Sequence, residues 1–122
     1  MTCFMIEPVY ILFGIPNCDT VKKARTYLEE RGVEFEFVDF KKDPPQKELI
    51  KYWTEVFKGL PVNKKGLTYK KFASSFEKLS NEAKIDFLIK NPSMIKRPIL
   101  QKENKVLYFG FESQEFDKLI GK

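Results

Sequence analysis

The stretch VYILFGIPNCDTVKKA, residues 9–24, decides the fold of this chain. Residues 9–13 form a continuous apolar run that Gly14 closes, which is typical of a strand buried on both faces of a sheet. A helical pattern begins near Cys18, and its apolar positions recur on one face until Gly32 ends it. These apolar positions are Val21, Ala24, Tyr27 and Leu28. The stretch therefore predicts a buried strand that leads directly into an amphipathic helix.

The residues after this helix complete a strand-helix-strand unit. Val33, Phe35 and Phe37 alternate with glutamates, which predicts a half-buried strand that ends near Phe40. Two strands joined by a single helix over so short a stretch are expected to be parallel.

The middle of the chain carries helical patterns. Pro44 and Pro45 break the chain and open a second helix, which ends before Gly59. Its predicted apolar stripe consists of Leu49, Ile50, Trp53, Val56 and Phe57. Two further helices are expected at about 68–76 and 80–90.

The last part of the chain predicts a hairpin and a final helix. Residues 98–101 and 106–109 are short apolar strands joined by the polar residues 102–105, which indicates an antiparallel pair. The final helix presents one apolar face, formed by Phe116, Leu119 and Ile120. Together the patterns predict an α/β fold with a thioredoxin-like four-stranded mixed sheet, and an α-helical insertion at about 45–92 separates its βαβ and ββα halves. We expect a single domain over residues 1–122.

The composition restricts the chemistry. The 122 residues are 43% hydrophobic and 32% charged, and they include no histidine, which excludes Ser-His or Cys-His catalysis and histidine-bound metals. Cys3 and Cys18 are too few and too far apart for a zinc site or a disulfide scaffold. The sequence lacks an apolar run of the roughly 20 residues that span a membrane, and it lacks a signal-peptide pattern. We therefore expect a cytoplasmic protein without a metal or a resident cofactor.

The positive charge is unevenly distributed. The net charge is +5, and the segment 58–78 alone contains six lysines against one acidic residue, Glu77. A solvated lysine-rich face is the simplest interpretation, and an anion site or an acidic partner are the alternatives.

Cys18 is the candidate nucleophile. It lies between the buried strand and the first turn of the predicted helix, where free N–H groups and the helix dipole stabilise a thiolate. Cysteines in such positions have pKa values of roughly 3.5 to 7.5, against about 8.5 for a free thiol. Lys22 and Lys23 add positive potential nearby, and Asp19 reduces it. The alternative is a small packed cysteine without reactivity.

Cys18 has no partner in a C-x-x-C motif. The position three residues later is Val21 and the position three residues earlier is Ile15, so a redox cycle would need a resolving thiol from elsewhere, such as glutathione or another protein. A bond between Cys3 and Cys18 remains an alternative at this stage.

Arg97 is a second candidate. It precedes Pro98, which introduces a predicted strand and could form a cis peptide bond. The guanidinium offers a fork of donors that suits an oxyanion, although a plain surface arginine explains the sequence equally well.

Three segments carry a family resemblance: FGIPNCDTVKKA, LPVNKKGLTYKKF and NPSMIKRPIL. With the helical insertion, they resemble the ArsC/Spx family, the arsenate-reductase-like branch of the thioredoxin fold, and above all its YffB-type members. The similarity runs from about Val9 to the C-terminal helix.

The resemblance implies a catalytic role for Cys18. In the family's arsenate reductases the matching cysteine attacks arsenate, releases water and forms a thiol-bound arsenate, which glutathione and a glutaredoxin then reduce. Three arginines and the backbone at the helix start hold the oxyanion, and the middle arginine matches Arg97, which precedes a cis proline, Pro98. The resemblance thus implies substrate contacts by Asn17, Asp19, Thr20, Lys64, Lys65 and Pro98.

This chain departs from the family at the other two arginines. Lys65 or Lys64 replaces the first, and the loop 109–111 lacks the third. Lysine is a point donor and cannot form a bidentate pair, so we expect arsenate itself to be a poor substrate. YffB-type members are thought to be glutathione-dependent thiol reductases, which makes glutathione the expected co-substrate here.

The sequence therefore supports two functional hypotheses. The first is a thiol-dependent reductase that acts on a small oxyanion or a disulfide with glutathione or glutaredoxin as partner. The alternative is an Spx/MgsR-type regulator that binds RNA polymerase, although the C-x-x-C pair of those proteins is absent. Direct binding of nucleic acid or a membrane is not expected, and an inert relic of the fold is a third interpretation.

Overall fold

A computed structural model describes residues 10–120. Its elements follow the order β1 (Tyr10–Gly14), α1 (Asp19–Glu30), β2 (Phe35–Asp39), α2 (Lys47–Phe57), α3 (Leu67–Glu77), α4 (Asn81–Lys90), the 3₁₀ turn η1 (Pro92–Met94), β3 (Ile99–Lys102), β4 (Lys105–Phe109) and α5 (Ser113–Ile120). Within this range, every helix is too short or too polar to cross a lipid bilayer.

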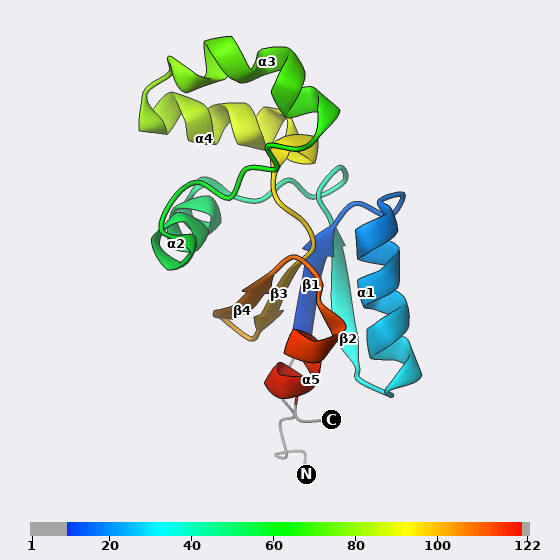
Figure 1. The fold of residues 1–122 in the computed structure, drawn as a ribbon. Helices are drawn as coiled ribbons and strands as arrows, with labels where there is room; N and C mark the ends of the chain where they lie inside the picture. Colours follow the sequence, from blue (N-terminus) through cyan, green and yellow to red (C-terminus); the bar gives the residue numbers. More distant parts are fainter. Residues whose placement is uncertain (1–9, 121–122) are drawn as a thin grey trace.

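The strands form one mixed sheet of four strands in the order β2-β1-β3-β4 (Figure 1). β1 is parallel to β2, while β3 is antiparallel to both β1 and β4. The predicted thioredoxin-like α/β fold is therefore confirmed.

Helices cover both faces of this sheet. Leu12 and Leu100 point to the face where α1 and α5 pack, and Phe116 of α5 is fully buried there. Phe13 and Ile99 are the neighbours of Leu12 and Leu100 in the same strands. They point to the opposite face, where they pack with Trp53 of α2. The alternation follows from the two-residue period of a strand, and it explains why β1 is apolar throughout.

Helix α1 packs closely against the end of β1. Val21, Ala24, Tyr27 and Leu28 are its buried residues, as the sequence predicts. A Cβ atom on Gly14 would lie only 2.8 Å from Cγ2 of Val21. Glycine at this position thus allows the first turn of α1 to approach the strand end closely.

Helix α2 differs from the prediction at its C-terminal end. Ile50 and Trp53 are buried, but Val56 and Phe57 are 46% and 39% exposed. The predicted stripe is therefore wrong over its last turn, because Val56 lies outside the buried core and Phe57 packs one side of its ring on Phe109 of β4 while the rest stays open. Trp53 makes a contact that periodicity does not predict, since its Nε1 donates to Oε1 of the buried Gln101 at 2.7 Å.

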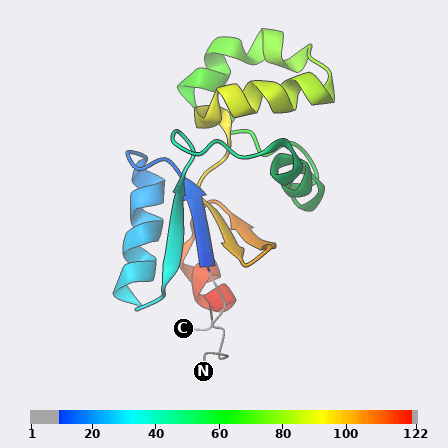
Figure 2. The same ribbon diagram turned by 180° about the vertical axis from the view of Figure 1, so that it is seen from behind.

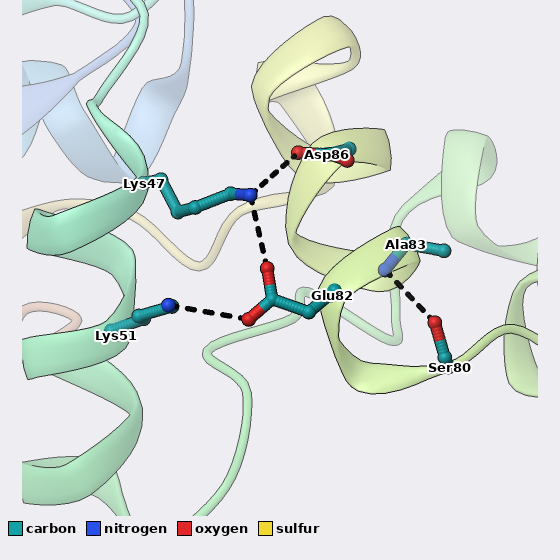
Figure 3. Close-up of polar contacts among 6 residues, drawn as sticks. All are labelled: Lys47, Lys51, Ser80, Glu82, Ala83 and Asp86. Atoms are coloured by element: carbon teal, nitrogen blue, oxygen red, sulfur yellow. Dashed lines mark hydrogen bonds and ion pairs between the residues drawn. The ribbon is translucent and has the colours of Figure 1, made fainter.

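Helices α3 and α4 lie side by side beyond the end of the sheet to which β1 and β2 point (Figures 1 and 2). Exposed ion pairs connect α4 to α2 (Figure 3). Lys47 Nζ lies 2.9 Å from Glu82 Oε2 and 3.7 Å from Asp86 Oδ1, and Lys51 Nζ lies 3.2 Å from Glu82 Oε1. Ser80 caps α4 by accepting a hydrogen bond from the Ala83 amide.

Several boundaries differ slightly from the prediction. β2 begins at Phe35 rather than Val33, because the Val33 amide donates to the Leu28 carbonyl and closes the end of α1. β3 begins after Pro98, at Ile99.

Candidate active site at the carboxyl edge of the sheet

One edge of the sheet gathers the candidate residues from distant parts of the sequence. Phe13 of β1 pairs with Ile99 of β3, so the residues that follow Phe13 and those that precede Ile99 reach the same edge. Cys18 follows β1 at this edge, and Arg97 and Pro98 precede β3. Carboxyl ends of parallel strands are where open α/β sheets bind ligands.

Cys18 is the N-cap residue of α1. Its backbone is extended, with φ −92° and ψ 127°, and its carbonyl accepts the Lys22 amide at 2.9 Å. The side chain is half-buried and its thiol is free. The N–H groups of the first turn have no acceptor further back in the helix, and the Cys18 side chain makes no capping hydrogen bond to them. The predicted helix-start position of the cysteine is thus present, and Cys3 lies outside the described residues.

The residues beside Cys18 are open to solvent. Asn17, Asp19 and Thr20 are all exposed around the start of α1. A shallow groove of about 430 Å³ runs along the same helix, and its lining includes Lys22, Lys23 and Phe111. The groove extends along α1 to Glu30 and Arg31, and its lining does not include Cys18.

Arg97 is half-buried, and the backbone before it holds its side chain. Its Nη1 donates to the carbonyl of Ser93 at 2.5 Å and to that of Ile95 at 3.3 Å. Its Nε is buried and has no acceptor among residues 10–120. Arg97 is therefore not a plain surface arginine, because the turn η1 orients its guanidinium and leaves one donor unpaired.

Pro98 follows Arg97 through a cis peptide bond, as the family resemblance implies. Its carbonyl accepts the Gly110 amide at 2.7 Å. Gly110 has a φ of 105°, in the left-handed region that favours glycine. This hydrogen bond joins the loop after β4 to the Cys18 edge, a link that the sequence alone does not reveal.

Lys64 and Lys65 are exposed in the loop before α3, and both line a cleft between α2 and α4. The lining of this cleft includes neither Cys18 nor Arg97. Lys64 lies near Glu77 and helps to lower the pKa of that carboxyl, after the larger contributions of the hydrogen bonds from Tyr69 and Lys84. A role for these lysines beside Cys18 stays a prediction.

Comparison with known proteins identifies the family. The ArsC family model matches residues 13–119. The chain belongs to the ArsC family. The matched range includes the whole edge described above, from the end of β1 to α5.

Three relatives of this ArsC-family protein indicate the range of functions around it. The solved structure of a YFFB protein is 33% identical, covers 89% of this chain and 96% of its own, and superposes with a TM-score of 0.76. A Streptococcus mutans UA159 structure described as "a possible arsenate reductase" is 28% identical, covers 87% and 93% of the two chains, and has a TM-score of 0.72. The global transcriptional regulator Spx of S. mutans is 29% identical over 85% of this chain and 77% of its own.

Proposed function

We propose that this ArsC-family protein is a thiol-dependent reductase that uses Cys18 as its nucleophile and glutathione as its co-substrate. The substrate is a mixed disulfide of a small thiol with glutathione. The Cys18 thiolate attacks the sulfur of the glutathione part and forms a new disulfide with it. The original sulfur–sulfur bond breaks, and the substrate leaves as a thiol after it takes up a proton. A glutathione thiolate then attacks the glutathione sulfur bound to Cys18. Glutathione disulfide leaves, and the Cys18 thiolate is regenerated.

The observation that carries this proposal is the position of Cys18 as a half-exposed N-cap of α1. The N–H groups of the first turn can donate hydrogen bonds to an anionic group that forms at this position, and a half-exposed side chain is accessible to a second molecule. The groove with Lys22 and Lys23 offers a surface for the carboxylates of glutathione.

Arg97 is proposed to stabilise negative charge that develops at the reacting atoms. Its guanidinium is held by the Ser93 and Ile95 carbonyls, and a fixed guanidinium is a suitable donor for negative charge that develops beside it. Asn17, Asp19, Thr20 and Pro98 surround the thiol in this proposal, and Lys64 and Lys65 contribute only if their loop turns toward the edge. Arsenate is expected to be a poor substrate because lysine cannot reproduce the bidentate contact of arginine.

The test combines mass spectrometry with turnover. After incubation with glutathione disulfide, we expect one glutathione on Cys18 of the wild-type protein and none at that position in Cys18→Ser. We also expect Cys18→Ser to abolish glutathione-dependent reduction of a small mixed disulfide. Cys3→Ser is the matched control and retains both signals. Turnover in Cys18→Ser would assign the chemistry to another group.

A regulator that binds RNA polymerase is the second candidate, and the similarity to Spx over most of the chain favours it. Purified polymerase distinguishes the two. Saturable binding by the wild-type protein, together with no turnover by Cys18, would replace the reductase proposal. An unchanged turnover without polymerase binding would leave the reductase as the function.

A further inference from the structure

A second surface lies away from Cys18, between the C-terminal half of α2 and the facing parts of α3 and α4. This α2/α4 cleft has a volume of about 980 Å³. Neither Cys18, Arg97 nor the first turn of α1 contributes to its lining. It is therefore available to a molecule that takes no part in the thiol chemistry.

The floor of the cleft is apolar. Leu60, Val62, Phe76 and Ile85 line it, and Phe57 adds a ring that is 39% exposed. The Phe57 ring packs against Phe109 with a centroid distance of 4.9 Å, so its position is fixed although its outer side is open. An exposed and fixed aromatic ring beside an apolar floor is the arrangement that hot spots of protein interfaces share.

Positive charge surrounds this floor. Six lysines and three glutamates line the cleft. Two of the glutamates are already paired, because Glu82 binds Lys51 and Lys47, and Glu77 binds Lys84 at 3.3 Å. Within the described residues, Lys58, Lys64, Lys65 and Lys96 form no ion pair, and Glu55 is the remaining acidic group of the lining.

The unpaired lysines come from three separate segments. Lys58 follows α2, Lys65 precedes α3, and Lys96 precedes β3. Small phosphate groups are usually held by converging N–H donors and arginine forks, and the lining contains no arginine among the described residues. Separate ammonium groups around an apolar floor suit several carboxylates spaced along a chain with apolar side chains between them.

We propose that the α2/α4 cleft binds an acidic peptide segment of a partner protein, with the partner's apolar side chains on the floor and its carboxylates beside Lys58, Lys65 and Lys96. The cationic segment 58–78 thereby acquires a binding role at its N-terminal part. This interaction does not depend on the proposed reductase activity, because the cleft lining includes neither Cys18 nor Arg97.

The probe is a fluorescein-labelled peptide of about twelve residues in which glutamates alternate with leucine and phenylalanine. One control peptide replaces each glutamate with lysine, and another replaces each apolar residue with serine. We expect saturable anisotropy for the acidic apolar peptide alone. Amide chemical shifts should change at Val62 and Ile85 and stay constant at Cys18.

Charge variants of the protein test whether the affinity for the acidic peptide follows the charge of the cleft. Lys58→Glu should weaken binding about five-fold and Glu55→Lys should strengthen it by a similar factor, because each changes the local charge by two at a short distance in water. Lys105→Glu on the β3–β4 hairpin makes the same change in net charge as Lys58→Glu and should leave binding unchanged. Circular dichroism of each variant confirms that the fold is retained.

Three results would overturn the proposal. Equal weakening by Lys58→Glu and Lys105→Glu would show a response to net charge alone. Equal binding of the acidic peptide with serine in place of its apolar residues would show that the apolar floor takes no part in binding. Self-association of the chain that Phe57→Ala abolishes would assign the cleft to a second copy instead.

Discussion

The Cys18 edge and the α2/α4 cleft share one buried core, but exposed ion pairs are added only between the helices around the cleft. Buried pairing positions the edge, through Phe13 opposite Ile99 and through the close approach of Gly14 and Val21. The helices around the cleft pack into the same core through Trp53, Phe76 and Ile85, and exposed ion pairs, such as Lys47 with Glu82 at 2.9 Å, are added at their surface. Buried packing contributes more than exposed charge pairs to stability. Changes to buried packing should therefore have large effects on stability, whereas changes to the exposed pairs between α2 and α4 should have small effects that depend on pH and salt.

Loss of Trp53 is the strongest expected disturbance of the edge. Its ring lies 5.1 Å from that of Phe13 and 6.0 Å from that of Phe40, at the ends of β1 and β2, and its Nε1 binds Gln101. Trp53→Ala should lower the free energy of unfolding by about 3–5 kcal/mol, measured by urea denaturation. Val56→Ala on the exposed end of the same helix should change it by less than about 0.5 kcal/mol. Equal losses of stability in Trp53→Ala and Val56→Ala would contradict the conclusion that buried packing dominates stability here.

Gly14→Ala tests the close contact between the end of β1 and Val21 in the first turn of α1. The added methyl would lie 2.8 Å from Cγ2 of Val21, a stiff β-branched side chain, so we expect a loss of up to about 3 kcal/mol of stability. Iodoacetamide should also alkylate Cys18 more slowly, because the first turn of the helix moves. The double variant Gly14→Ala/Val21→Ala provides the control, and it should recover part of the alkylation rate. An unchanged alkylation rate in Gly14→Ala would show that the reactivity of Cys18 does not depend on this packing contact.

Arg97→Ala tests charge stabilisation at the edge. If Arg97 contacts the developing charge, its loss should reduce kcat by about 30-fold, equivalent to about 2 kcal/mol. Arg97→Lys should recover only part of this loss, because lysine keeps the charge without the fork. A rise in KM at constant kcat would indicate substrate binding alone. Unchanged constants would assign Arg97 to the support of η1 through the Ser93 carbonyl.

Local patterns predicted the elements and the position of Cys18, because strand and helix periods depend on neighbouring residues. The buried face of α1, which includes Val21 and Leu28, follows directly from this spacing. Contacts between distant segments were not predictable in the same way. The bond between Trp53 and Gln101 joins residues 48 positions apart, and Arg97 is held by carbonyls of a turn that the sequence did not indicate. The partial exposure of Phe57 likewise depends on its contact with Phe109 of β4, which helical periodicity does not predict.

The smallest expected effect concerns the ion pairs between α2 and α4. Hydrogen bonds from Lys47 and Lys51 lower the pKa of Glu82, and Glu82 in turn raises the pKa of Lys47. A lowered folded pKa means that the contribution of Glu82 is fully present above its ordinary value of 4.5 and is lost as the pH falls through the folded value. Glu82→Gln should therefore lower Tm at pH 7 by less than about 4 °C, and this difference should vanish at strongly acidic pH.

The control for this pair is Glu34→Gln, since Glu34 is an exposed glutamate outside the helical insertion. It should leave Tm nearly unchanged at pH 7 and at acidic pH. High salt should reduce the effect of Glu82→Gln, because the paired groups are solvent-exposed and screened. The rate of Cys18 alkylation should stay constant in Glu82→Gln, since α1 and β1 do not depend on this contact. A fall in that rate would mean that the ion pairs also position the edge, and the two regions would then form one coupled unit.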